Sequence, residues 1–251
     1  MISAMQDDTS GVVLVEKRER VATIYLNRPD SRNALNWELV TSLRRAIESV
    51  SADEAVRVVV LRGRGKSFCA GADLKEAKVT GYGEHRAWTN ELAGLIDAVR
   101  TCTVPVIAGV HGHAIGAGCT LAMICDYVFL ARDSELSFPE LRHGLTPGMT
   151  IPQLQRLVGP RRAMDLILTG ATISAVEAVT WGIASEAVNP DELDRAIATL
   201  ASVIAKYDPE PVRAVKRLAR AVEAMSPAAA EAAGVDAVII RRLHSQVGAE
   251  G

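Results

Sequence analysis

Short apolar runs that alternate with helix-like segments constrain the fold of this chain more than any other feature. Val56–Leu61 is a nearly continuous apolar run, typical of a strand buried on both faces. Val106–Val110 and Tyr127–Ala131 are expected to form two more strands. Between them, helices are expected at Glu84–Arg100 and from about Ala117 onward. This alternation predicts an α/β core.

The two ends of the chain differ from this core. Val12–Lys17 and Val21–Leu26 predict an N-terminal β-hairpin. From Asp191 onward the strand signals vanish and alanine becomes frequent, which predicts a purely helical region. We therefore expect a core over residues 1–190 and a helical region over 191–251. The further expected helices are Asn36–Val50, Ala163–Leu168, Ser174–Trp181 with Ser174 as N-cap, Asp191–Ala205, Glu210–Ala224 and Ala228–Leu243.

Composition excludes several classes of protein. The formal net charge of −2 over 251 residues is not that of a nucleic-acid-binding chain. The most apolar stretch contains two histidines and an aspartate, so we expect no membrane span. The first ten residues lack the apolar segment of a signal peptide, which predicts a cytoplasmic protein. The cysteines form no CxxC pair and no zinc pattern, so we expect no metal and four buried thiols in a reducing compartment: Cys69, Cys102, Cys119 and Cys125.

Two glycine motifs resemble nucleotide-binding loops but are incomplete. Gly65–Ser67 matches the end of a phosphate-binding loop, yet Leu61 occupies the position where that loop needs a glycine. Gly116–Gly118 is half of a dinucleotide motif, and Leu121 replaces its last glycine. Neither a nucleoside triphosphate nor a nicotinamide or flavin cofactor is therefore expected.

Two segments have the same design of strand, small-residue turn and helix. Ser67–Lys75 follows the strand Val56–Leu61, and His111–Cys119 follows the strand Val106–Val110. Small side chains let a ligand approach the backbone, and a helix N-terminus supplies free N–H groups. Two such donors aimed at one point form an oxyanion hole. The alternative for each segment alone is tight packing of a strand against a helix.

Further motifs surround these segments in a fixed order: Asn27–Asn36, Phe138–Gly148 and Leu168–Gly170. With them, the chain resembles the enoyl-CoA hydratase/isomerase family, the crotonase superfamily, over about residues 12–225. The resemblance implies an α/β, crotonase-like (ClpP/crotonase) spiral of ββα units. It also implies that residues 191–251 are a trimerisation region, and that the protein is a homotrimer or a hexamer formed from two trimers. The expected substrate is an acyl-CoA thioester of fatty-acid metabolism, with coenzyme A as part of the substrate and no separate cofactor.

The resemblance also implies roles for individual residues. The thioester oxygen would lie between the N–H groups of Ala72 and Ala117. Glu140 matches a catalytic glutamate, and Gly148 matches a glycine that can orient water. Thr120 replaces the other glutamate of the hydratases. Contacts to substrate or CoA are expected from Arg32, Ala70, Gly71, Asp73, Leu74 and Lys75, where Asp73 is also expected to brace its loop and Lys75 could equally be a surface lysine.

A single glutamate suits one reaction of this family better than another. A threonine can hold a water molecule but cannot act as its general base near neutral pH. Isomerases of the family typically work with a single glutamate at the position of Glu140, so the resemblance implies isomerisation of a 3-enoyl-CoA to a 2-enoyl-CoA, with Glu140 as the proton shuttle. One alternative is a hydratase, or another reaction of the superfamily, that recruits His143 or an acid from Glu84–Arg100. The other is an acyl-CoA-binding protein without activity. For His113 and Asp126 a structural role is expected.

Overall fold

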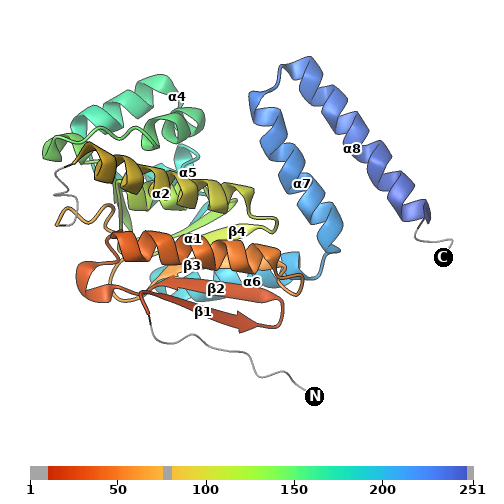
Figure 1. Ribbon diagram of the computed structural model, residues 1–251, viewed down its shortest axis with the longest axis horizontal. Coiled ribbons are helices and arrows are strands. Elements are labelled where there is room, and N and C mark those ends of the chain that lie inside the picture. Colours follow the sequence, from red (N-terminus) through yellow and green to blue (C-terminus); the bar gives the residue numbers. More distant parts are fainter. Residues whose placement is uncertain (1–10, 76–80, 248–251) are drawn as a thin grey trace.

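The computed structural model describes residues 11–75 and 81–247, with side chains described as far as residue 240. The prediction about a signal peptide concerns residues 1–10, which lie outside this part. The chain forms a six-stranded and a three-stranded sheet surrounded by helices (Figure 1).

The large sheet has the strand order β1-β2-β3-β4-β6-β9. β1 and β2 pair antiparallel, which confirms the predicted hairpin, and every other pair is parallel. Its strands are β1 Val13–Arg18, β2 Val21–Leu26, β3 Val58–Gly63, β4 Val106–Val110, β6 Tyr127–Ala131 and β9 Glu186–Val188.

The small sheet was not predicted from the sequence. It consists of β5 (His113–Ile115), β7 (Glu135–Ser137) and β8 (Ile173–Ser174) in that order. A parallel bridge between Cys69 and Ala114 extends it to the segment that follows β3. Successive units of the chain therefore place one strand in the large sheet, then extended backbone in the small one, and then a helix.

The helices largely match the predicted ones. Their bounds are α1 Trp37–Ala52, α2 Tyr82–Thr101, α3 Ala117–Met123, α4 Thr150–Thr169, α5 Ala175–Thr180, α6 Leu193–Ala205, α7 Pro209–Ala221 and α8 Pro227–Val247, with short 3-10 turns η1 Pro29–Ser31, η2 Glu140–His143, η3 Pro190–Glu192 and η4 Val222–Ala224. The segment labelled α4 consists of two helices that meet at Gly159, whose φ of 75° and ψ of 164° are not helical. The helix predicted from Ala163 lies in the second of them, which contains Pro160, and the first was not predicted.

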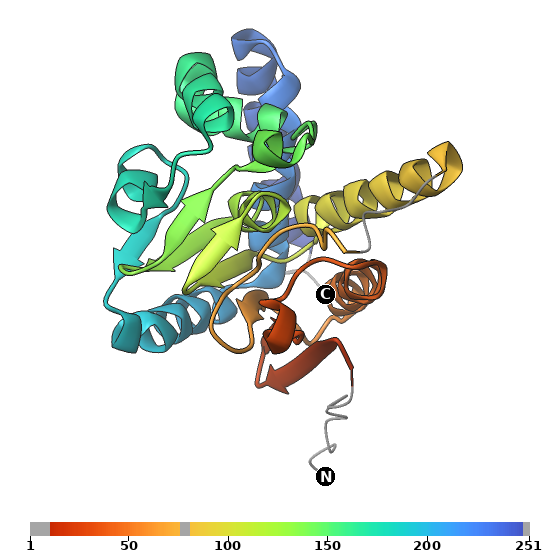
Figure 2. The same cartoon turned by 90° about the vertical axis from the view of Figure 1, so that its left-hand side faces the viewer.

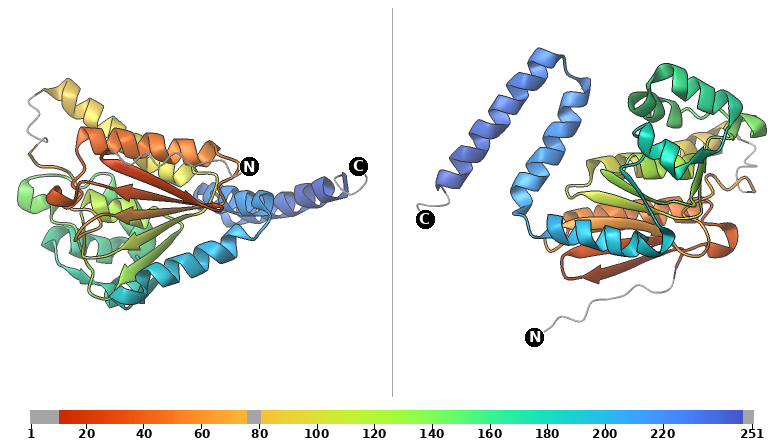
Figure 3. Two further views of the ribbon diagram at one scale, coloured as in Figure 1. Left: turned by 90° about the horizontal axis from the view of Figure 1, so that it is seen from below. Right: turned by 180° about the vertical axis from the view of Figure 1, so that it is seen from behind.

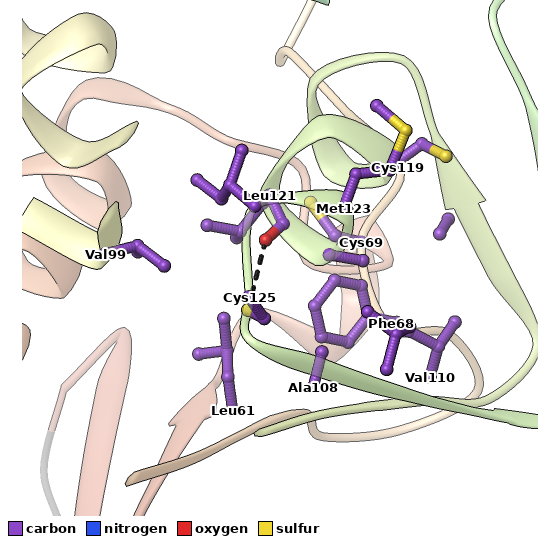
Figure 4. Close-up of a cluster of buried hydrophobic side chains, with 14 of the residues drawn as sticks. Leu61, Phe68, Cys69, Val99, Ala108, Val110, Cys119, Leu121, Met123 and Cys125 are labelled. Atoms are coloured by element: carbon purple, nitrogen blue, oxygen red, sulfur yellow. Dashed lines mark hydrogen bonds between the residues drawn. The ribbon is translucent and has the colours of Figure 1, made fainter. Parts of the chain in front are cut away.

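The helices cover both faces of the large sheet. α1 packs on one face beside α2, and α6 packs on the other against β3, β4 and β6 (Figures 2 and 3). All four cysteines are buried free thiols, as predicted, and three of them lie among apolar side chains in Figure 4. Within the described part of the chain, no helix is long and apolar enough to cross a membrane.

The helices α7 and α8 form a hairpin that extends away from the sheets (Figures 1 and 3). A buried lysine, Lys216, attaches α7 to the core. Its Nζ donates to the Val104 carbonyl at 2.7 Å and to the Asp126 carboxylate at 2.5 Å. Asp126 also accepts from the Val106 N–H at 2.7 Å and from Arg220 at 3.3 Å. Asp126 thus has the structural role expected for it.

Candidate functional site

The first backbone donor is the N–H of Ala72. Leu35 pairs with Ala72 in a parallel bridge, in which the Leu35 N–H donates to Gly71 and the Asp73 N–H donates to Leu35. In such a ladder Ala72, which lies between the two bonded residues Gly71 and Asp73, directs its own N–H away from Leu35. No acceptor for the Ala72 N–H exists among the described residues. The expectation that a helix start frees this amide was wrong: α2 begins only at Tyr82.

The second backbone donor is the N–H of Ala117. Ala117 is the first residue of α3, so its amide has no partner within the helix. The preceding Gly116 takes a positive φ of 52°, which turns the chain sharply from β5 into the helix. The Gly116 N–H donates to the Ser137 carbonyl at 2.8 Å. The helix start predicted near Ala117 is confirmed.

The two donor segments are in direct contact. Cys69 donates its N–H to His113, and Ile115 donates its N–H back to Cys69. A Cβ atom added to Gly71 would lie 2.6 Å from the Ile115 carbonyl oxygen and 3.6 Å from the Ala117 nitrogen. The two free amides therefore belong to adjoining backbone, the arrangement that an oxyanion hole needs.

A buried asparagine braces the first donor segment. The Asn33 side chain donates to the carbonyls of Arg64, Ser67 and Phe68 at 2.8–3.1 Å and accepts the Arg28 N–H at 2.8 Å. It is fully buried. The motif that contains Asn33 was evident in the sequence, but its bracing role was not, because the three carbonyls that it binds lie more than thirty residues away.

A cavity of about 500 Å³ opens in front of both donors. Eight of the predicted site residues line it: Ala70, Gly71, Ala72, Leu74, Ala117, Thr120, Glu140 and Gly148. Lining residues that sequence reasoning missed include Trp88, Leu92, Ile96, Met149 and Thr150. On α2, the lining residues Trp88, Leu92 and Ile96 recur at helical spacing, and this pattern is visible in the sequence.

Three predicted residues lie outside the lining of this cavity. The Asp73 carboxylate accepts from the Arg28 guanidinium at 3.0 Å, so it braces its loop as expected. Arg32 supports the same loop through its backbone, because its carbonyl accepts the Ala70 N–H at 2.9 Å. Lys75 is exposed.

Glu140 is the one carboxylate among the described residues that line the cavity. It begins the 3-10 turn η2, and its Oε1 lies 3.0 Å from where a Cβ atom of Gly116 would be. Its Oε2 is buried and has no hydrogen-bond partner in the described structure. Burial raises the pKa of Glu140, and its own backbone N–H and the nearby His143 oppose that shift in part. A carboxylate with a raised pKa can both take and return a proton near neutral pH.

Thr120 faces a second hydroxyl rather than a carboxylate. Its Oγ1 lies 2.8 Å from the Oγ1 of Thr150 and donates to the Gly116 carbonyl at 3.2 Å. Both threonines are buried. The local back-bonding that is common for threonine in helices is therefore present, and the contact with Thr150 adds to it.

The other acid–base candidates differ in their positions. His143 lines the cavity, whereas His113 does not. His113 lies 3.3 Å from the Ser67 hydroxyl and 3.6 Å from the Glu135 carboxylate. None of the acidic side chains of α2 lines the cavity. Among the described residues, no three His, Cys, Asp or Glu side chains group as a metal ion would require.

Comparisons with known proteins agree with this geometry. The model of the enoyl-CoA hydratase/isomerase family matches residues 16–246. A probable enoyl-CoA hydratase from Rhizobium meliloti is 39% identical over 213 residues, which cover 84% of this chain and 82% of that protein. The crotonyl-CoA hydratase of Syntrophomonas wolfei is 39% identical over 186 residues, 72% of this chain and 70% of that protein.

Solved structures share the fold. The crystal structure of an enoyl-CoA hydratase from Mycobacterium smegmatis superposes with a TM-score of 0.90 at 31% identity, covering 92% of this chain and 91% of that one. The predicted crotonase-like fold is thereby confirmed. This chain belongs to the enoyl-CoA hydratase/isomerase family and is an enzyme of that type.

Proposed function

We propose that the protein converts a 3-enoyl-CoA into the conjugated 2-enoyl-CoA, with Glu140 as its only proton shuttle. The observation that carries this proposal is the composition of the cavity. Of the described lining residues, Glu140 alone bears a carboxylate, and the Thr120 position offers a neutral hydroxyl. Moving a proton between two carbons of one substrate needs a single acid–base group, whereas activating a water molecule for addition gains from a second.

The proposed reaction has three steps. The thioester oxygen accepts hydrogen bonds from the Ala72 and Ala117 N–H groups, which makes the C2 protons more acidic. Glu140 takes a C2 proton, and the negative charge of the resulting dienolate resides largely on the oxygen held by the two amides. Glu140 then delivers its proton to C4, so that the double bond lies between C2 and C3 and the carboxylate is restored. Coenzyme A takes part as a portion of the substrate, and the reaction needs no other cofactor.

The test is a substitution that keeps the shape of Glu140 but removes its basicity. The Glu140→Gln variant is expected to lose at least about 10²-fold in kcat/KM for a 3-enoyl-CoA, followed by the absorbance of the conjugated thioester. Glu135→Gln is the matched control, because Glu135 is exposed and lies outside the cavity. Unchanged activity of Glu140→Gln would refute the proposal.

A second candidate function is hydration of a 2-enoyl-CoA. It is favoured by the relatives described above, whose names are those of enoyl-CoA or crotonyl-CoA hydratases. In that reaction Glu140 would act alone on a water molecule held by the threonine hydroxyls. His143 is a further group within the same cavity that could assist.

We also propose that the working form is a homotrimer or a hexamer of two trimers. The support is the α7–α8 hairpin, which presents exposed apolar side chains: Val215, Val235, Val238 and Ile239. Exposed apolar faces of this kind mark protein–protein interfaces.

A further inference from the structure

The turn that carries Glu140 presents a second ionisable side chain to the same cavity. Glu140 and His143 are the first and last residues of η2, and both line the cavity. In a 3-10 turn, side chains three positions apart lie above one another. Leu141 and Arg142 do not line the cavity, and the Arg142 guanidinium donates instead to two carbonyls at the end of α4, both at 3.0 Å. Glu140 and His143 therefore share one face of the turn.

The backbone of η2 holds this pair together. The Gly144 N–H donates to the Leu141 carbonyl at 3.1 Å, and the Leu145 N–H donates to the Glu140 carbonyl at 3.0 Å. The charge of His143 accordingly acts on the carboxyl group, since among the described side chains it is the one that opposes the raised pKa of Glu140. The two groups are thus close enough to influence each other's protonation.

The two side chains differ in their access to water. Oε2 of Glu140 is buried and has no hydrogen-bond partner among the described residues. His143 is exposed, so it lies where the cavity opens to solvent. A proton that Glu140 takes from a substrate is therefore held away from bulk water. An imidazole both accepts and releases protons near neutral pH, and His143 stands between the carboxyl group and the solvent.

One other histidine lines the cavity in the part of the chain that the structure describes. His85 lies in the first turn of α2, and its N–H donates to the Gly81 carbonyl at 3.1 Å. It belongs to a different element from Glu140, and its charge does not contribute to the pKa shift of that carboxyl group. His85 therefore offers a matched control: an exposed histidine at the same cavity that is not coupled to Glu140.

We infer that His143 is the route by which the proton held by Glu140 exchanges with water during the reaction. Once Glu140 has taken a C2 proton, its carboxylic acid has two fates. It delivers the proton to carbon, or it passes the proton to neutral His143, whose imidazolium then releases a proton to water. The reverse transfers bring a solvent proton back to Glu140. Only O–H and N–H bonds form and break in this relay, and both residues return to their starting states.

This inference rests on the proposed role of Glu140 as proton shuttle but not on isomerisation, because removal and return of a C2 proton is enough to reveal it. His143 acts through Glu140 and not on the substrate, so it is a positioning residue. The readout must therefore separate the origin of the delivered proton from the rate of the reaction.

The first experiment follows isomerisation of 3-butenoyl-CoA by the full-length protein in D₂O. The 2-butenoyl-CoA formed at low conversion is analysed by mass spectrometry for deuterium at C4. The wild type should incorporate solvent deuterium. The H143Q variant should keep nearly the same kcat, while exchange relative to direct transfer falls at least about tenfold, because a positioned proton carrier contributes about 10²–10⁴-fold. The H85Q variant should match the wild type in both respects.

The second experiment uses butyryl-CoA, which has no double bond to move. Exchange of its C2 protons for deuterium is followed by NMR, and it requires only that Glu140 removes a proton and returns one from the solvent. H143A should slow this exchange at least about tenfold. Added imidazole should restore it, since the small base fits the space left by the exposed side chain and takes over the relay. A purely structural role of His143 would give no such rescue.

The outcomes separate this inference from the proposed function. If H143Q and the wild type incorporate deuterium equally, or if H143Q lowers kcat and leaves the deuterium content unchanged, His143 is not the relay, although isomerisation by Glu140 stands. An isomerising wild type without deuterium at C4 also overturns the inference. If the wild type exchanges the C2 protons of butyryl-CoA but does not isomerise 3-butenoyl-CoA, the proposed function fails, and H143A with imidazole decides the relay. Absence of both reactions refutes both.

Discussion

At the scale of single residues, Gly116 links the components of the site. Its backbone positions the Ala117 amide, its carbonyl accepts from Thr120, and its Cα faces Glu140. A Cβ atom at this position would lie 3.0 Å from Oε1 and 3.3 Å from Cδ of Glu140. The φ of 52° with ψ of −118° is also a conformation that only glycine adopts readily. The missing side chain is therefore what lets the Glu140 carboxylate lie against Gly116, next to the Ala117 amide.

The Gly116→Ala variant is expected to fold less stably and to lose about 10²-fold in kcat, because the new methyl group displaces the Glu140 carboxylate. Steady-state kinetics on a 3-enoyl-CoA measure the loss. Gly83→Ala on α2 is the control, since a Cβ atom there meets nothing within 4 Å. If Gly116→Ala kept wild-type kcat, contact with Gly116 would not determine the position of Glu140.

The pH dependence should report the burial of Glu140. Only its carboxylate form removes the C2 proton, so kcat/KM falls as pH falls through the pKa of Glu140. Because burial raises that pKa, the acidic limb should lie above the ordinary value of 4.5. A raised pKa also means that ionising Glu140 costs folding free energy. Glu140→Gln should therefore gain stability over the wild type as pH rises through that pKa. An acidic limb at or below 4.5 would contradict this account.

Sequence reasoning found the residues that lie within local motifs and missed those that act through distant contacts. Ala72, Ala117, Thr120 and Glu140 stand in segments whose order along the chain is itself informative, and all four line the cavity. Thr150 carries no such signal. Its significance depends on the packing of α3 against α4, which a pattern of residue types does not contain.

At the scale of elements, the short segment around η1 holds the segment that contains Ala72 in place. Asn33 is central, because its amide group spans three carbonyls on the segment that follows β3. Arg28 adds a hydrogen bond to Asp73, beyond the donor residue Ala72. A segment that forms almost no regular structure thus determines where the Ala72 N–H group lies.

The Asn33→Asp variant should be destabilised by about 3 kcal/mol or more, since the new carboxylate faces buried carbonyls and removes their donor. Urea unfolding measures this loss, and activity should fall with it as the donor segment loosens. Asn90→Asp, at an exposed position on α2, is the matched control and should change stability little. Equal stability of the two variants would show that Asn33 does not brace the loop.

Elements were predictable where their own residues determine them. α1, α2 and the β1–β2 hairpin have long periodic or β-branched patterns, and they form where expected. β5, β7, β8 and β9 have only two or three residues each, so their pattern is too short to be recognised and their strands exist only through pairing. For the same reason, the sequence did not reveal why the Ala72 amide is free. The amide is free because Ala72 pairs with Leu35, which is distant in the sequence.

At the scale of the whole molecule, the α7–α8 hairpin is the part whose exposed apolar surface is hardest to explain for a single chain. Lys216 fixes α7 to the core, and a cavity of about 850 Å³ separates much of α7 from the core. Exposed apolar side chains continue along α8. This surface is unfavourable in water unless another surface covers it.

Analytical ultracentrifugation of the wild type is expected to show a trimer or a hexamer. Val235→Asp/Val238→Asp should shift the protein to smaller species, because burying a charge in an apolar interface is costly. Glu231→Gln on the same helix should leave the assembly unchanged. A wild type that sediments as a monomer at all concentrations would contradict the assignment of α8 to subunit contacts.

The most direct test of a one-carboxylate isomerase compares two substrates with the same wild-type protein. A 3-enoyl-CoA and the matching 2-enoyl-CoA are supplied separately, and the absorbance of the conjugated enoyl thioester is followed. The account predicts that absorbance rises with the first substrate and stays nearly constant with the second. A fast fall with the second and no rise with the first would contradict it, and would mean that Glu140 and the threonine hydroxyls together suffice for hydration.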